Sequence, residues 1–594
     1  MEMDNHQYKL IDFIRIPFRS SPVIVVMLVI ETVISSLIPA LQIIVTARFI
    51  DTAISIFNNE ATQSNIVVSL IWILLLLTYQ YIAAVLMGLF RSKMNIKLSE
   101  TYCVDIIHKR AKLEYKHIED NETWELIERV AGNPAGQILS GFGILLQMLS
   151  IVIRVVSLLS VIISQIWWAG LVIIIFTVPL FWLAVRSGKM NYQASKEAAK
   201  YSRRAGYLQS VLTGRENVEE RTLFSYSDKV NQQYYNKFLS AYHINFKTQR
   251  NRFLKMKSAS LITVIISIMI AGALVVPLGA GKITIGLFMM FVTSTFDLAQ
   301  IMSWNLTHIT SQLANHREYL KDLTDFYQLS ETGSVTDLPS THCFAPDSIE
   351  FRDVSFSYPG TEEIILHHLN LKLHAKKRYA FVGINGAGKT TITKLLTGLY
   401  HNYTGEILID GMELHQFTQS EIKAMFSVVY QDYVKYQTPM RDSIGIGNVR
   451  GATDKEIVNA IEKIGLDEAN LKLSNGLDTP LGKIKEGGVD LSGGEWQKVA
   501  IARSLVNPAP IRILDEPTAA LDPVVESEVY KLFGRVSVDK TTIFITHRLG
   551  AARLADEILV ISEGKVAESG THDELIGLGG IYAEMFEAQK EWYN

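Results

Sequence analysis

The 594-residue chain has only two cysteines, Cys103 and Cys343, which lie far apart in the sequence. This number and separation argue against a disulfide framework and against a cysteine-based metal motif. The formal net charge is only -3, so no excess of one sign indicates a nucleic-acid partner. The first residues lack a short apolar segment followed by a small-residue cleavage site, so we expect the first apolar run to remain in the mature protein.

Long apolar runs, by contrast, dominate the first half of the chain. Hydrophobic residues make up 48% of the sequence and the mean hydropathy is +0.17, which is high for an ordinary soluble protein. A helix needs about 20 apolar residues to cross a bilayer. Runs of this length predict membrane spans near residues 22–48, 66–89, 139–163, 167–186, 259–279 and 284–309.

Basic residues are distributed unevenly between the connections of these spans. The short connection at 165–168 has none, whereas the segments 91–137 and 189–257 are rich in Lys and Arg. By the positive-inside rule, both long segments and both termini are expected in the cytoplasm. Apolar residues at helical spacing in these segments predict that spans two to five continue as helices and turn at tips near 114–127 and 213–224. Each tip is either a simple turn or a contact with the domain that follows.

A polar segment with turn residues, 331–347, separates the spans from a region that alternates strand-like and helix-like runs. Within that region, RYAFVG at 378–383 reads as a buried strand, GINGAGKT at 383–390 as a loop and the next residues as a helix. Glycines in such a loop let backbone N–H groups approach phosphates, while Lys389 reaches the terminal phosphates and the Thr390 hydroxyl ligates magnesium. The pattern therefore predicts a nucleotide-binding loop.

Two further motifs accompany this loop. RILDEP at 512–517 is an apolar strand that ends in two acids, of which Asp515 is placed to hold a metal and Glu516 to address an attacking water. LSGGE at 491–495 is a second glycine pair before a helical run and so a second anion cradle. A single domain has little use for two such cradles.

Together these motifs resemble the ATP-binding cassette. GINGAGKT resembles Walker A, SVVYQD the Q-loop, LSGGEWQ the signature, RILDEP Walker B, TAALD the D-loop and FITHRL the switch. With six preceding spans, the chain resembles a half-transporter of the bacterial multidrug, lipid and peptide exporter group. The resemblance implies a six-helix transmembrane domain (1–330), a linker (331–347) and an α/β P-loop cassette (348–594). It also implies ATP hydrolysis coupled to transport at the plasma membrane.

The resemblance assigns roles to individual residues. It makes Glu516 and His547 catalytic and places Thr390, Gln431 and Asp515 around Mg²⁺. It implies that ATP is bound by Tyr358, Gly383, Asn385, Gly386, Gly388, Lys389, Thr390, Thr391, Gln431, Ser492, Gly493, Gly494 and Asp522. In this family the signature of one cassette closes over ATP on another, so the partner is a second copy of the chain or, alternatively, a paralogous half-transporter.

Three positions depart from the family pattern. Arg512 stands where an apolar strand residue is usual, which predicts either that its side chain reaches the sheet edge or that the strand is less buried. Lys483 follows Gly482 where exporters often have an acid, and the nearest acid is Glu486, so the residues of the loop that contacts the transmembrane tips are not assigned. Glu495 replaces the more frequent glutamine of the signature and keeps an acceptor.

Ionisable residues inside the spans indicate a polar interior. Glu31, Arg154 and Asp297 would each cost about 2.5 to 3.5 kcal/mol at mid-bilayer if they faced lipid, so they should face one another or water. At helical spacing they share faces with other polar residues, and with Trp304 and His308 they form the expected substrate cavity. The polar residues could equally serve as hydrogen bonds between helices.

The charges of this trio suggest a cargo. One arginine cannot neutralise two carboxylates, so Arg154 is expected to pair with one acid and leave the other for a cationic group. This predicts export of an amphipathic small molecule, lipid or peptide that carries positive charge. An importer on the same architecture and a non-transporting sensor or gated pore remain alternatives.

Overall fold

The computed structural model describes residues 6–591 except 61, 63, 166–196, 199, 215–216, 302–304, 334–335, 343, 467–474, 484–486, 518–525, 527–530 and 532–539. The chain divides into two compact units, one formed by Met1–Lys109 and Glu125–Leu329 and the other by Arg110–Trp124 and Ser330–Asn594. The second unit thus includes a short segment from within the helical half of the sequence.

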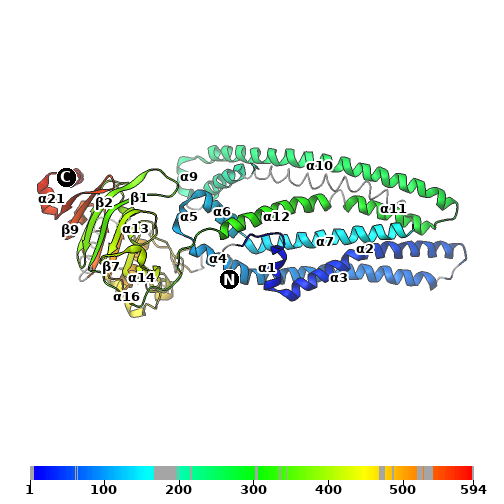
Figure 1. The fold of residues 1–594 in the computed structure, drawn as a ribbon, viewed down its shortest axis with the longest axis horizontal. Coiled ribbons are helices and arrows are strands. Elements are labelled where there is room, and N and C mark those ends of the chain that lie inside the picture. Colours follow the sequence, from blue (N-terminus) through cyan, green and yellow to red (C-terminus); the bar gives the residue numbers. More distant parts are fainter. Residues whose placement is uncertain are drawn as a thin grey trace. The chain divides into compact units, whose positions relative to one another are not determined.

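The first unit is built from long helices that run side by side (Figure 1). Its helices are α1 (Asp12–Ser20), α2 (Pro22–Phe57), α3 (Ser64–Leu98), α4 (Val104–Lys112), α6 (Asn121–Ala131), α7 (Pro134–Gln165), α9 (Val218–Phe224), α10 (Ser227–Gly279), α11 (Ile285–Gln300) and α12 (Leu306–Tyr327). Three helical stretches in the described residues are long and apolar enough to span a membrane: Pro22–Phe57, Ser64–Lys112 and Pro134–Ser164. The fourth expected span, 167–186, lies outside the described residues.

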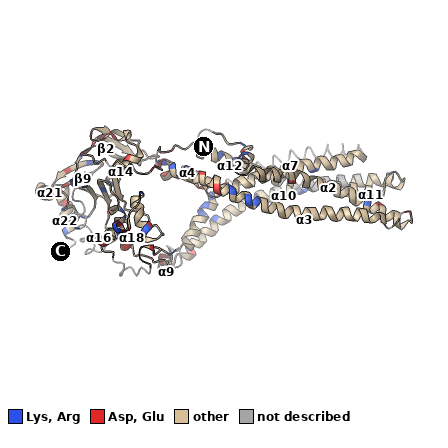
Figure 2. Cartoon of the chain, turned by 90° about the horizontal axis from the view of Figure 1, so that it is seen from below, with Lys and Arg blue, Asp and Glu red and all other residues tan. Residues whose placement is uncertain are grey.

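The helices extend well beyond a bilayer, as the sequence predicted. The helical run Ser64–Lys112 has 49 residues and α10 has 53. At about 1.5 Å per residue, either is more than twice as long as the hydrocarbon core is thick. Figure 2 shows α3 almost without charged residues over most of its length and Lys and Arg gathered towards α4, the end expected in the cytoplasm. The predicted helical extensions of the spans are therefore confirmed where the structure describes them.

The second unit contains two sheets, ordered β2-β1-β4-β5 and β10-β9-β3-β8-β7-β6. In the six-stranded sheet, β9, β3, β8, β7 and β6 are parallel and β10 is antiparallel. The strands are β1 (Ser348–Ser357), β2 (Ile364–His374), β3 (Arg378–Val382), β4 (Thr404–Ile409), β5 (Met412–Glu413), β6 (Phe426–Val429), β7 (Ile511–Asp515), β8 (Thr541–Ile545), β9 (Glu557–Ser562) and β10 (Lys565–Gly570).

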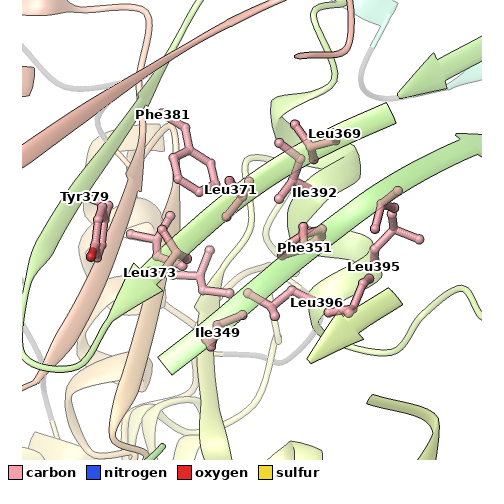
Figure 3. Packing of buried hydrophobic residues seen from close by; sticks show 14 of the residues in the cluster. Ile349, Phe351, Leu369, Leu371, Leu373, Tyr379, Phe381, Ile392, Leu395 and Leu396 are labelled. Carbon is pink, nitrogen blue, oxygen red and sulfur yellow. The ribbon is translucent and has the colours of Figure 1, made fainter. Parts of the chain in front are cut away.

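Helices flank these sheets. They are α5 (Tyr115–Glu119), α13 (Lys389–Leu396), α14 (Gln419–Met425), α15 (Met440–Gly445), α16 (Asp454–Lys463), α18 (Gly493–Leu505), α20 (Leu549–Ala552), α21 (His572–Leu578) and α22 (Ile581–Glu591). The main hydrophobic core contains residues from both sheets and from α13. Phe351 of β1, Phe381 of β3 and Ile392 of α13 belong to this one cluster (Figure 3). This core holds the start of α13 in a fixed position at the end of β3.

Candidate functional site

The predicted nucleotide residues gather at one edge of the parallel sheet. The loop 383–388 follows β3, Asp515 ends β7, His547 follows β8 and Gln431 follows β6. Because β3, β8, β7 and β6 are parallel, their carboxyl ends meet at the same edge, which is where ligands bind in open α/β sheets. The fold therefore brings together side chains that are more than 160 residues apart in the sequence.

The loop after β3 depends on its glycines. Gly383 has φ of 152°, and a Cβ on it would lie 2.2 Å from the carbonyl oxygen of Ile561. Gly388 has φ of 102° and is the residue before the first turn of α13. Asn385 and Gly386 between them are exposed, so the backbone of the loop is open to a ligand. The loop and the following helix N-terminus form a cradle suited to phosphate.

Lys389 lies inside this cradle. Its ammonium group donates to the carbonyl oxygens of Gly383 at 2.8 Å and Ile384 at 3.0 Å. Burial lowers the pKa of Lys389, while the nearby charges of Glu516 and Asp515 oppose this effect. A bound phosphate would supply the anionic partner that the two carbonyl groups only partly replace.

Asp515 is a buried carboxylate with few partners. The residue is 1% exposed, and the Thr390 hydroxyl and the Lys389 ammonium are the neighbours that favour its charged form. Burial raises the pKa of Asp515 to about 6. A carboxylate in this state fits a hard cation, so Asp515 and Thr390 are the residues that would hold Mg²⁺, with Gln431 exposed at the same edge. The cation would neutralise charge on the phosphates.

Glu516 and His547 are paired. The Nδ1 atom of His547 lies 3.3 Å from Oε1 of Glu516. Glu516 has a left-handed backbone with φ of 46°, and its N–H donates to the carbonyl oxygen of Ile545 at 3.0 Å. This strained conformation turns the Glu516 side chain away from the strand direction of β7. The two predicted catalytic residues are therefore within reach of one another and next to Asp515.

The signature residues lie at the start of α18. Ser492 caps the helix, its Oγ accepts from the N–H of Glu495, and the Glu495 carboxylate accepts from the N–H of Ser492 at 2.7 Å. Gly493 and Gly494 form the first turn of the helix. In the described part of the chain, no hydrogen bond or ion pair joins these residues to the loop 383–388. Asp522 lies outside the described residues.

The aromatic residue expected to stack on adenine is Tyr358, which follows β1 and is half-buried. Its hydroxyl lies 2.9 Å from Oγ1 of Thr391, and its ring packs edge-on against Tyr400 with centroids 5.6 Å apart. The ammonium of Lys394 lies 5.3 Å from the Tyr358 centroid. Tyr358 is thus tied to the helix that follows the phosphate loop.

Helix α5, from the predicted tip at 114–127, docks against this same group. Glu119 forms an ion pair with Lys394 at 2.8 Å and accepts from the hydroxyl of Tyr400. Tyr115 packs edge-on against Tyr400 with centroids 5.4 Å apart and lies 5.4 Å from the Lys394 ammonium. The sequence marked this tip but did not identify Lys394, because no motif assigns a partner to a lysine in the middle of α13.

Arg512 and Lys483, which depart from the family pattern, both have partners in the structure. Arg512 lies in the fully buried strand β7 and is 1% exposed, so both expectations, a side chain at the sheet edge and a less buried strand, are wrong. The reason is that its long side chain packs under the sheet against α18, where Nη2 reaches the carbonyl oxygen of Ser504 at 3.5 Å. Lys483 pairs with Asp490 rather than standing free. Glu486 lies outside the described residues.

In the helical unit, Arg154 of α7 and Asp297 of α11 form an ion pair. Arg154 Nη2 donates to Oδ1 of Asp297 at 2.6 Å and Nε donates to Oδ2 at 3.1 Å. Glu31 of α2 instead accepts from the hydroxyl of Ser35. Trp304 lies outside the described residues. Of the three predicted charged residues, Arg154 and Asp297 therefore pair with each other, whereas Glu31 hydrogen-bonds within its own helix.

Two cavities adjoin this ion pair, and a third cavity adjoins one of the two. Arg154 lines cavities of about 260 Å³ and about 310 Å³, the second of which also includes Asp297. A third, of about 390 Å³, shares Gln147 and His308 with the first. Glu31 is not among the described residues that line them. One unit thus has a phosphate cradle at a sheet edge, and the other has polar cavities between long apolar helices. This combination fits the class of membrane transport ATPases.

Comparison with known proteins agrees with this geometry. Residues 366–519 match the ABC transporter family and residues 25–300 match the ABC transporter transmembrane region. An ATP-dependent lipid A-core flippase of Desulfotalea psychrophila is 31% identical over 81% of this chain and 82% of its own length. The chain belongs to the ABC transporter family. It is a multi-pass membrane protein of exporter type that couples ATP hydrolysis to transport.

Other relatives and one solved structure extend the comparison. The subtilin transport ATP-binding protein SpaT of Bacillus subtilis is 28% identical over 94% of this chain and 90% of its own. The nisin transport ATP-binding protein NisT of Lactococcus lactis is 29% identical over 84% and 83%. The structure of a bacterial Atm1-family ABC exporter with ATP bound superposes with a TM-score of 0.72 at 25% identity, over 95% of this chain and 98% of that one.

Proposed function

We propose that this chain exports an amphipathic molecule from the cytoplasm by alternating access, driven by ATP. The observation that carries the proposal is the contact of α5 with α13 through Glu119 and Lys394. Helix α5 interrupts the chain between α4 and α6, which continue the membrane helices, while α13 begins at Lys389 of the phosphate loop. Movement of α13 on ATP binding would therefore move α5, and with it the helices α4 and α6 to which α5 is joined.

The names of the relatives support two classes of cargo. Two are named for the transport of subtilin and nisin, and others are named lipid A-core flippases. The cavities beside Arg154, of about 260 and 310 Å³, suit part of a molecule that carries both polar and apolar groups. We infer a peptide or lipid cargo of this kind.

The working unit in this proposal is a pair of identical chains in the plasma membrane, with both termini in the cytoplasm. Two cassettes would hold two ATP with Mg²⁺ between the phosphate loop of one chain and the signature of the other. A complete set of nucleotide residues, including Glu516, His547 and Ser492, supports two equal sites and hence a homodimer. A paralogous half-transporter as the partner is the alternative.

Transport itself is tested with inside-out membrane vesicles. Vesicles carrying the wild type or Glu516→Gln are given ATP and a panel of amphipathic peptides, lipids and cationic dyes, and accumulation is measured. We expect accumulation of at least one class in the wild type and none in the variant, because Glu516 addresses the attacking water. The class that accumulates identifies the cargo.

Two other outcomes would point elsewhere. ATP-dependent release of cargo from preloaded inside-out vesicles would indicate import. Ion current without accumulation would indicate a gated pore. Either result would replace the export proposal while leaving the nucleotide site as described.

A further inference from the structure

Two of the cavities in the helical unit adjoin one another, and we refer to the two together as the chamber. They share Gln147 of α7 and His308 of α12, and their volumes are about 260 Å³ and about 390 Å³. The chamber lies between the start of α7 and the first turns of α12, on the side of the ion pair towards the cytoplasmic ends of the spans. Its polar lining residues are Arg91, Ser140, Gln147, Ser150, Arg154, Asn305, His308 and Gln312.

The polar lining of this chamber combines two arginines with neutral side chains that can donate hydrogen bonds. Arg91 and Arg154 line it, and no Asp or Glu is among the described lining residues. Within the described part of the chain, Arg91 makes no ion pair or hydrogen bond, and it is exposed. Gln147 and His308 are likewise exposed to the chamber, so their polar atoms are available to a ligand.

Among the described residues that line the three cavities, Asp297 is the one acid, and it is already paired. It receives hydrogen bonds from both Nε and Nη2 of Arg154, and its side chain is 23% exposed. The cavity on the other side of this pair is lined mainly by apolar residues, among them Ile43, Met289 and Met290. Arg91 is not paired with an acid in the described part of the chain, so it would repel a cation that enters the chamber and attract an anion.

We propose that this chamber, lined by Arg91, Gln147 and His308, binds an anionic group, a phosphate or a carboxylate, on an amphipathic molecule. The proposal rests on the export function proposed above, since it assigns the charge of the cargo. It is opposite to the cationic cargo that the three charged span residues suggested. The difference arises because Asp297 is paired with Arg154 and Glu31 is not among the described residues that line the three cavities, so neither carboxylate is left to face a cation there.

Matched probes test the charge of the ligand. Radiolabelled dodecyl phosphate, dodecanoate and dodecyltrimethylammonium have the same apolar chain. Their binding to the full-length protein in nanodiscs is measured without nucleotide, with empty nanodiscs subtracted. We expect both anionic probes to bind at least tenfold more tightly than the cation. Inorganic phosphate at equal concentration should compete weakly, because it lacks the apolar chain.

Variants test the site. Arg91→Gln should weaken dodecyl phosphate binding about tenfold and His308→Leu by a smaller factor, while Arg91→Lys should restore most of the affinity. Arg19→Gln is the matched control, because Arg19 is an exposed arginine of the same unit that lines none of the three cavities. It should bind like the wild type.

Each contrary result would overturn a different part of the proposal. Equal or tighter binding of the cation, or wild-type affinity in both Arg91→Gln and His308→Leu, would overturn the anion site. Full competition by inorganic phosphate would overturn the amphipathic ligand. Binding is measured without ATP, so this test does not depend on export. If anion binding depends on Arg91 but no cargo accumulates in vesicles, the export proposal is wrong and the anion site stands.

Discussion

Arg512 is a buried cation with little to balance it. Its Nε and Nη1 atoms have no hydrogen-bond partner, and burial lowers its pKa to about 10. At neutral pH the guanidinium therefore stays charged inside the core, where an unpaired charge is costly. Its aliphatic stem nevertheless fills space between β7 and α18, so removing the charge and removing the volume should have opposite effects.

Arg512→Met keeps most of the volume and removes the charge, so we expect thermal unfolding at a temperature a few degrees higher than in the wild type. Arg512→Ala should unfold earlier, because it leaves a cavity. Arg503→Met is the control, because Arg503 donates to the carbonyl oxygen of Ser443 at 3.0 Å and lies over the Tyr436 ring, and its loss should destabilise. A lower unfolding temperature for Arg512→Met would mean that the charge itself is stabilising.

Asp515 predicts a pH effect. Its pKa rises from 3.8 to about 6 on folding because of burial, so between these values the folded protein holds a proton that the unfolded chain has released. Stability without metal should therefore fall as the pH rises from about 4 to 6, by about 2 kcal/mol. Asp515→Asn should not show this fall in stability, because the amide does not titrate. The difference between the unfolding temperatures of the variant and the wild type, measured in EDTA, should widen across this range.

ATP hydrolysis gives the second measurement on the same variant. Asp515→Asn should lose hydrolysis while unfolding at a higher temperature, because it removes both the metal ligand and the cost of a buried charge. A difference in unfolding temperature that stays constant with pH would show that Asp515 does not titrate in this window. Hydrolysis retained at wild-type rate would remove Asp515 from the metal site.

At the scale of elements, α5 is held to the cassette by few contacts, and Glu119 makes two of them. The Glu119 and Lys394 side chains are 34% and 19% exposed, so their ion pair is worth about 1 kcal/mol at most. Glu119→Gln should therefore raise the rate of backbone hydrogen exchange in residues 115–119 by about fivefold. Glu122→Gln, at an exposed acid in the first turn of α6, should leave it unchanged. Equal exchange in all three proteins would exclude Glu119 as the anchor.

Local patterns were enough to predict the long helices of the first unit, where the structure describes them, and the cassette elements that carry motifs. The strand, loop and helix around Gly383 and Lys389 follow from spacing, and the long helical run Ser64–Lys112 follows from apolar length and basic ends. Contacts between distant elements were not predictable in the same way. Glu119 and Lys394 are 275 residues apart, and helical spacing placed Glu31 and Asp297 on interior faces without deciding which one Arg154 would reach. These pairings depend on how the helices pack.

At the scale of the whole molecule, the separation of the two anion cradles matters most. Ser492 and Gly493, which are exposed, lie at the start of α18, and in the described residues no hydrogen bond or ion pair joins them to the loop around Lys389. If each signature completes the site of another chain, two different defects should compensate for one another. Chains with Lys389→Ala and chains with Ser492→Ala each form inactive pairs alone, because both of their composite sites are damaged.

A mixed pair, however, has one site with both defects and one site with none. We expect co-purified pairs, selected with a different tag on each chain, to recover up to half of the wild-type ATP hydrolysis rate. Pairs in which both chains carry the same substitution, purified in the same way, are the controls and should remain near zero. No recovery in mixed pairs would mean either that a chain uses its own signature or that both sites must act together.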